Sequence, residues 1–188
     1  GLTLEPRPVQ DPFPPIYIAA GSIASAEEAA RLGANLSITC LSSDLASLPL
    51  LRDRYLEVWA ECGHRHAPRI TVLAHVYCDT TTEGARDHLQ HYQGPFQSWV
   101  IGKKTGVPPE QVELPERFTD LNSPDCVIAV GSPQDVLDKI CHVVELAGAD
   151  RFIFQGDYGG QPWPNVMRSL EMFASDVMPH LKKLQKAA

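Results

Sequence analysis

The sequence lacks the marks of several large protein classes. Acidic residues outnumber basic ones by 23 to 16, and the formal net charge is −7. The basic patch that a nucleic-acid backbone requires is therefore missing. No uninterrupted apolar run approaches the roughly 18 residues that a membrane span needs. The opening residues, GLTLEP, carry neither the basic nor the apolar segment of a secretory leader. We expect no nucleic-acid partner and no membrane association.

Paired cysteines and the common nucleotide or hydrolase motifs are also missing. The five cysteines are odd in number and scattered, and none forms a CxxC pair. That usage is typical of reduced thiols in a cytoplasmic protein. No GxSxG elbow, P-loop or GxGxxG fingerprint occurs, so the usual signals of hydrolases and nucleotide-binding folds are lacking.

What is present is a repeating alternation of apolar strands and amphipathic helices. The strands are expected at residues 16–20, 35–40, 69–77 and 151–155, and helices at 25–32, 48–62, 133–147 and 165–184. Continuous apolar runs favour strands buried on both faces, as in parallel sheets. For the first helix we expect Ser25 as the N-cap, Glu28 completing a capping box, and Gly33 as the stop.

The alternation predicts an α/β fold in a single domain over residues 1–188. Four such units are half of an eight-stranded TIM-type barrel, since complete barrels need about 250 residues. A doubly wound open sheet of four parallel strands has the same alternation, so the pattern alone leaves both architectures open. Between about residues 79 and 125 the periodicity loosens, although residues 82–92 look helical. We interpret this segment as an irregular insertion with short helices of its own.

Four segments, in order, resemble the luciferase-like, flavin-dependent monooxygenases. They are RPVQDPFPPIYIAAGS (residues 7–22), SAEEAARLG (25–33), VGSPQDV (130–136), and a C-terminal signature of GGQP (159–162), RSLEMFA (168–174) and VMP (177–179). The resemblance covers nearly the whole chain and is weakest between residues 79 and 125. It implies strands five to eight of the barrel, with strands one to four absent.

The resemblance also implies a function. Full-length members use reduced flavin to activate O2 and oxygenate an organic substrate, so this chain would contribute part of such an enzyme and be incomplete alone. The implied cofactor is flavin mononucleotide (FMN), with the deazaflavin F420 as the alternative. The implied partners are an aldehyde-like substrate, O2 and a flavin reductase as donor. The two unpaired edges of a half-barrel also favour a homodimer, and a non-catalytic, flavin-binding or dimerising half-barrel is the second hypothesis.

Candidate cofactor residues lie where strands end. A helix N-terminus offers free N–H groups and a positive dipole end to a phosphate, and the resemblance places the flavin phosphate at Ala20, Gly21, Ser22 and Ser25. The competing interpretation is an ordinary helix cap preceded by a turn. Glu27 and Glu28, expected in the same first turn, are an electrostatic objection. The catalytic residues stay unknown and are expected in the missing half.

Two further sets of residues have weaker signals. Cys40 and Ser42 end the second strand, where the family packs side chains near the flavin ring, although a buried cysteine is more often a small hydrophobic residue. Glycines in the loop of residues 157–160 could let the backbone approach flavin or substrate. The histidines at 64, 66, 88 and 91 lack the tight Cys/His pairing of zinc sites, so we expect no metal.

Overall fold

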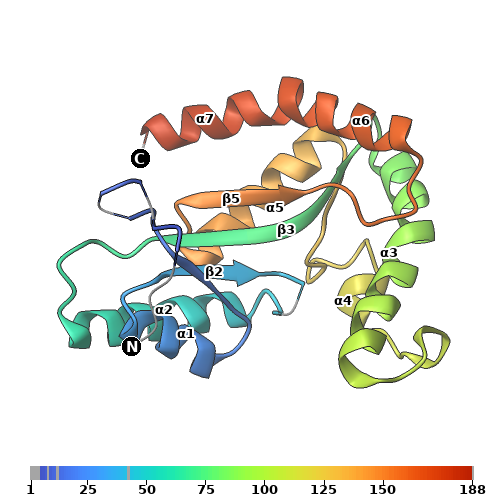
Figure 1. Cartoon of the computed structure of the whole chain (residues 1–188). Coiled ribbons are helices and arrows are strands. Elements are labelled where there is room, and N and C mark those ends of the chain that lie inside the picture. Colours follow the sequence, from blue (N-terminus) through green and yellow to red (C-terminus); the bar gives the residue numbers. More distant parts are fainter. Residues whose placement is uncertain (1–4, 8, 12, 42, 188) are drawn as a thin grey trace.

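The computed structural model of this chain describes residues 5–7, 9–11, 13–41 and 43–187, with side chains described as far as residue 182. Its centre is one parallel sheet (Figure 1). The strands are β1 (Tyr17–Ala20), β2 (Asn35–Thr39), β3 (Ile70–Cys78), β4 (Ala129–Gly131) and β5 (Arg151–Gln155). β1 pairs with β2, β2 with β3, and β3 with both β5 and the short β4.

The order of the strands separates the two architectures that the sequence left open. The four predicted strands neighbour one another in chain order, β1-β2-β3-β5, all in parallel. An open doubly wound sheet reverses its order at a switch point, whereas a barrel does not. The sheet is also curved, because the Arg151 guanidinium on β5 lies 5.6 Å from the Tyr17 ring on β1, although β2 and β3 intervene. The observed sheet is the predicted half of a barrel.

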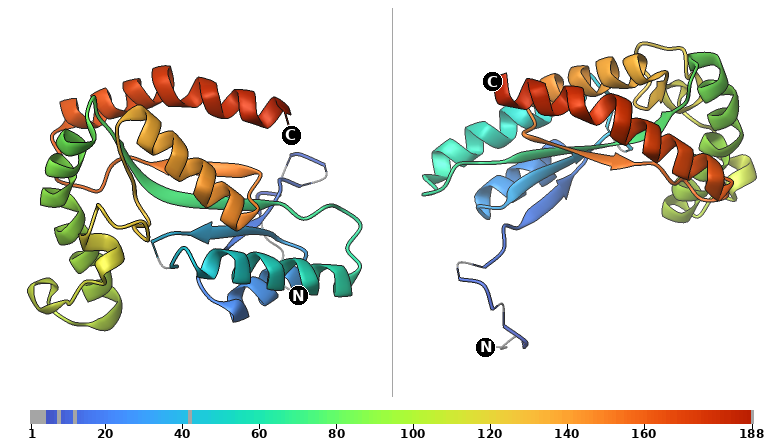
Figure 2. Two further views of the ribbon diagram at one scale, coloured as in Figure 1. Left: turned by 180° about the vertical axis from the view of Figure 1, so that it is seen from behind. Right: turned by 90° about the horizontal axis from the view of Figure 1, so that it is seen from above.

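Helices cover the convex face of this sheet in succession. They are α1 (Ile23–Arg31), α2 (Ser47–Cys62), α5 (Pro133–Ala147), and a C-terminal rod. Each packs on the next around the outside, and α5 lies behind β3 and β5 (Figures 1 and 2). The rod consists of α6 (Trp163–Met172), a π-helical turn (Phe173–Val177) and α7 (Met178–Ala187). It occupies the place of the single last helix predicted from the sequence.

The first helix begins two residues earlier than predicted. Ser22, not Ser25, is the N-cap, and Ser25 takes the third helical position and closes the capping box. Ser22 is the better cap because it lies in the extended conformation that an N-cap requires. Glu27 and Glu28 therefore fall in the second turn of α1, and no acidic residue lies in the first.

The segment predicted as an irregular insertion contains one long helix. α3 spans Thr82–Thr105 and is followed by the short helices η1 (Pro109–Gln111) and α4 (Glu116–Thr119). The expectation of short helices alone was wrong for two reasons. Pro95 lies inside α3, where proline normally ends a helix. The buried face of α3 also includes Gln93 and Gln97, which hid its apolar period.

A fifth strand was also missed. β4 pairs only with Val76–Cys78, beyond the stretch of β3 that β2 and β5 use. Its three residues are too few to show a period. The helix that follows was predicted correctly: Ser132 caps α5, Pro133 takes its first position and Asp135 completes a capping box.

Candidate cofactor and substrate rim

The carboxyl ends of all strands lie at one rim of the sheet, because the strands are parallel. The junction of β1 with α1, the segment after β2, the β3–α3 junction and the loop of residues 156–162 after β5 all lie there. Figure 1 shows α3 running across this rim beside the loop that follows β5. In α/β barrels this rim carries the active site.

The junction at residues 21–25 is open to solvent, as an anion site requires. Gly21, Ser22 and Ala24 are exposed and Ser25 is half-buried. Ala20 closes β1 as a buried residue, only 1% exposed, so it packs in the core behind the junction. The N–H groups of Ile23 and Ala24, in the first turn of α1, have no acceptor within the helix.

The two serines at this junction are engaged with one another. Ser22 Oγ accepts a hydrogen bond from the Ser25 N–H at 3.3 Å, and Ser25 Oγ donates to the Ser22 carbonyl at 2.8 Å. Ser25 Oγ also accepts from the Ser22 N–H at 3.1 Å. The Ser22 hydroxyl proton can turn either to Ser25 Oγ, 3.0 Å away, or to an anion. Ser22 is thus the available hydroxyl, and Ser25 holds the loop.

One of the two acidic residues near the junction, Glu27, opposes an anion less strongly than the sequence suggested. Glu27 accepts hydrogen bonds from Arg31 and Arg54, both at 2.6 Å. The Arg54 and Arg31 guanidinium groups hold the pKa of the Glu27 carboxyl below its ordinary value. Its charge is therefore balanced one turn away from the free N–H groups.

Cys40 lies away from the concave face of the sheet. It follows Leu36 and Ile38, whose side chains face the helices, and its own side chain is fully buried. Burial raises the pKa of the Cys40 thiol to about 12, so at neutral pH it is a protonated, inert group. Its predicted flavin contact stays a prediction, and the side chain is placed for packing against the helices. Ser42 lies outside the described residues.

A cluster of aromatic and amide side chains occupies the other side of the rim. His75 on β3 is fully buried, and its Nδ1 lies 3.1 Å from Gln93 Oε1 on α3. The His75 ring lies 4.2 Å from the Tyr158 ring and 5.3 Å from the Phe96 ring. Burial lowers the pKa of His75 to about 4. Sequence reasoning missed this cluster, because β3, α3 and the loop after β5 are far apart in the chain.

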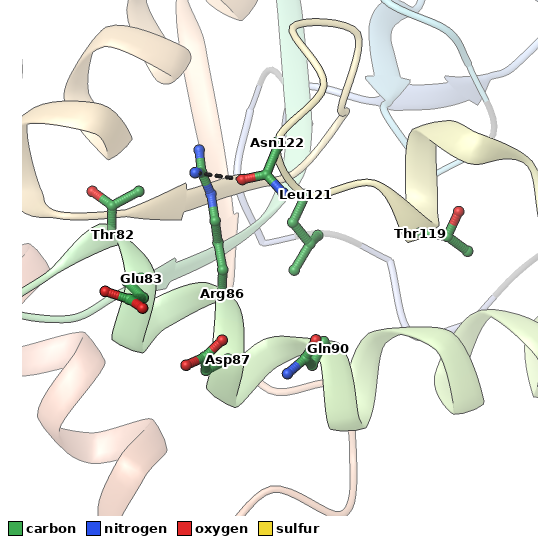
Figure 3. A pocket seen from close by; sticks show the side chains of 8 residues that line it. All are labelled: Thr82, Glu83, Arg86, Asp87, Gln90, Thr119, Leu121 and Asn122. Carbon is green, nitrogen blue, oxygen red and sulfur yellow. Dashed lines mark hydrogen bonds between the residues drawn. The ribbon is translucent and has the colours of Figure 1, made fainter.

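A polar pocket lies where α3 begins, lined by Thr82, Glu83, Arg86, Asp87, Gln90, Thr119, Leu121 and Asn122 (Figure 3). Its volume is about 390 Å³. The Arg86 guanidinium donates to Asn122 Oδ1 at 2.7 Å. Its cation thus ties α3 to the segment before β4, and we assign this pocket a structural role.

Three of the four histidines named in the sequence, His64, His66 and His88, have structural partners. His64 Nε2 lies 2.7 Å from the Ala30 carbonyl oxygen, and the Trp59 ring is tilted against the His64 ring at 4.5 Å and the His66 ring at 5.0 Å. His88 stacks on Tyr77 at 4.5 Å. Among the described residues, no three or more His, Cys, Asp or Glu side chains gather into a possible metal site. In the same part of the chain, no helix is both long and apolar enough to cross a bilayer.

Comparison with known proteins supplies the family. The family model described as luciferase-like monooxygenase matches residues 1–151, so the chain belongs to the luciferase-like monooxygenase family. This confirms the resemblance seen in the sequence.

Two curated proteins are similar to this chain over almost its whole length. The chain is 26% identical, over 94% of its length, to the oxygenase component of the flavin-dependent trigonelline monooxygenase of Acinetobacter baylyi, and covers 51% of that protein. A second curated relative is the uncharacterized protein y4vJ of Sinorhizobium fredii, at 24% identity over 94% of this chain and 52% of that protein. The chain thus spans about half the length of the curated relatives it matches.

Solved structures agree on the fold. The oxygenating constituent of 3,6-diketocamphane monooxygenase from Pseudomonas putida, a type II Baeyer-Villiger monooxygenase in complex with FMN, superposes with a TM-score of 0.62. Its identity is 24%, over 89% of this chain and 49% of that one. The F420-dependent tetrahydromethanopterin reductase from Methanopyrus kandleri gives a TM-score of 0.61 at 16% identity, over 88% and 50% of the two chains.

Proposed function

We propose that this chain supplies the flavin-phosphate site of a luciferase-like, flavin-dependent monooxygenase, and that the other half of the barrel is needed for turnover. The observation that carries this proposal is the exposed β1–α1 junction at the carboxyl rim. It combines free N–H groups, a hydroxyl that can turn outward and a first turn without carboxylates.

The residues of the junction divide the work of holding a phosphate. The N–H groups of Ile23 and Ala24 and the positive end of the α1 dipole attract the anion. Ser22 donates its hydroxyl proton, and Ser25 keeps the loop in place through its bond to the Ser22 carbonyl. Gly21 has no side chain to block the approach, and the buried Ala20 anchors the end of β1 behind the junction.

When bound, reduced flavin supplies the oxygen-activating chemistry, and the protein orients it and excludes water. The family membership supports FMN, O2, an organic substrate and a flavin reductase as electron donor. The resemblance implies an aldehyde-like substrate, and this is the first substrate to test. F420 is the alternative cofactor, and the likeness to the F420-dependent reductase supports it. An absorption spectrum of the purified protein distinguishes the two cofactors.

Variants at Ser22 test the phosphate site. Both Asp and Asn are good N-caps, so Ser22→Asp and Ser22→Asn should each preserve α1. Ser22→Asp places a carboxylate where the phosphate is proposed to bind, and we expect its FMN affinity to fall at least about tenfold, which is ~1.4 kcal/mol. Ser22→Asn should change it by less than about threefold. Equal FMN affinity in wild type and Ser22→Asp, with unchanged thermal unfolding, contradicts the site.

Turnover tests the incompleteness of the chain. With reduced FMN, O2 and a long-chain aldehyde, we expect no oxidised product from this chain alone. Sustained product formation would refute the need for a second half. Sedimentation tests the non-catalytic alternative, because a dimer that does not bind flavin supports a purely structural half-barrel.

A further inference from the structure

An aromatic groove runs between α3 and the loop that follows β5. Its volume is about 540 Å³. Its walls include the rings of Tyr92, Phe96, Trp99 and Tyr158, and Asp157 with its neighbouring glycines forms one border. Both elements lie at the carboxyl rim of the sheet (Figure 1), on the same rim as the proposed phosphate site. The groove has no part in the phosphate site itself.

The walls of the groove are fixed by buried contacts. Tyr158 is 2% exposed and packs against the His75 ring at 4.2 Å. His88 lies 4.9 Å from the Tyr92 ring, and its Nε2 lies 3.2 Å from Gln161 Oε1 on the opposite side of the groove. Gln161 in turn donates to the Gly156 carbonyl at 3.2 Å. The aromatic surface is therefore already formed before any ligand arrives.

The groove carries one carboxylate among its aromatic walls. Among its described lining residues Asp157 is the only carboxylate, none is lysine or arginine, and His91 is the one other ionisable side chain. Asp157 Oδ1 accepts a hydrogen bond from the Gly159 N–H at 2.8 Å, which holds the carboxylate at the border. The Lys103 ammonium already lies 5.8 Å from the Trp99 ring centroid. An indole of the groove is thus disposed to attract a cation.

We propose that this groove binds a planar organic cation, such as an N-alkylated pyridinium ring. Aromatic faces attract cations that carry no hydrogen-bonding shell, and a nearby carboxylate adds to that attraction. A neutral aldehyde would use the aromatic walls and leave Asp157 without a role, and an anion would be repelled. The role of the groove as the substrate subsite of the oxygenase rests on the proposed function. The binding of a cation in the groove does not depend on it.

Fluorescence of Trp99 tests the groove directly and without flavin. In a Trp163→Phe background, Trp99 is the remaining exposed tryptophan, because Trp59 is only 5% exposed. The ligands are 1-methylnicotinamide, which is permanently charged, and nicotinamide, its neutral parent. We expect saturable quenching, with affinity for the cation at least about threefold above that for the neutral ring. Quenching that rises linearly without saturation, or equal affinities, overturns the proposal.

Charge variants separate cation recognition from simple apolar binding. Asp157→Asn should weaken binding of 1-methylnicotinamide about threefold or more, while leaving nicotinamide unchanged. The matched control is Asp87→Asn, which removes an exposed carboxylate on α3 that lies outside the groove, and it should have no effect. Lys103→Met removes the competing ammonium from Trp99 and should tighten cation binding up to about twofold.

The outcomes distinguish this inference from the proposed function. An Asp157→Asn variant that binds the cation as wild type does overturns the groove assignment, whatever the FMN affinity. Loss of FMN binding in Ser22→Asp together with wild-type cation binding supports both sites. Cation binding by a chain with no FMN affinity supports the groove and contradicts the flavin proposal.

Discussion

The two faces of the sheet differ in how completely this chain covers them. On the convex face Leu36, Ile38 and Val72 are fully buried beneath the helices. On the concave face Leu73 is half-buried and Ile153 is 38% exposed. Residues that neighbour one another across parallel strands share a face, and on this concave face Thr71 and His75 are buried while Leu73 and Ile153 are not. The convex core of β2 and β3 is closed within this chain, whereas the part of the concave face around Leu73 and Ile153 has room for further neighbours.

Shortening one side chain on each face should give the largest difference between the faces, measured as the free energy of unfolding. Ile38→Ala removes apolar contacts from a closed core and should lower the free energy of unfolding by about 2–5 kcal/mol. Ile153→Ala, made in the same way on the concave face, should cost less than about 1 kcal/mol, because its side chain already meets solvent. Urea unfolding of both variants measures the contrast. Equal losses would show that the concave face is also closed.

Acid should act on the concave face through His75. Burial lowers its pKa to about 4, so the folded state favours the neutral ring. An unfolded chain takes up the proton near pH 6.5. Stability is therefore complete above about pH 6.5 and falls as the pH drops toward 4, by at most roughly 3 kcal/mol.

Unfolding measured from pH 7 to pH 4 tests this dependence. The variant His75→Gln should lose most of the decline over that range. The matched control His142→Gln, an exposed residue on α5, should retain it. If His75→Gln keeps the full wild-type decline, another group is responsible.

Thiol reactivity should give the smallest effect, which is a difference between cysteines in the rate of labelling, without loss of stability. Cys62 is exposed, while Cys40, Cys78 and Cys126 are buried. A disulfide reagent should label Cys62 quickly and Cys40 only after unfolding, since burial also raises the pKa of the Cys40 thiol to about 12. Cys62→Ser should abolish the fast phase. Rapid labelling of Cys40 in the native protein would contradict its placement in the convex core.

Local signals in the sequence were enough for most of the fold. The apolar runs at β1, β2, β3 and β5 and the Ser-Pro start of α5 each act over a few residues, and each was predicted within two residues. The choice of Ser25 over Ser22 as cap failed because both serines fit the pattern, and only the backbone conformation decides between them. The curvature of the sheet depends on strand order, which no single segment encodes.

The two candidate sites differ in how far apart their residues lie in the sequence. Gly21, Ser22 and Ser25 are neighbours in the chain, so a resemblance over a short segment could indicate them. Tyr92 and Tyr158 are 66 positions apart in sequence and meet only because α3 folds back over the rim. The long helix itself was hidden by Pro95 and by two buried glutamines, so the groove could not be predicted.

Affinity for FMN relative to riboflavin tests the central proposal most directly, because the two flavins differ only by the phosphate. If the N–H groups and hydroxyl at residues 21–25 hold that phosphate, FMN should bind this chain at least about tenfold more tightly, and inorganic phosphate should compete with it. Equal affinities for the two flavins, with no competition by phosphate, would contradict the proposed site.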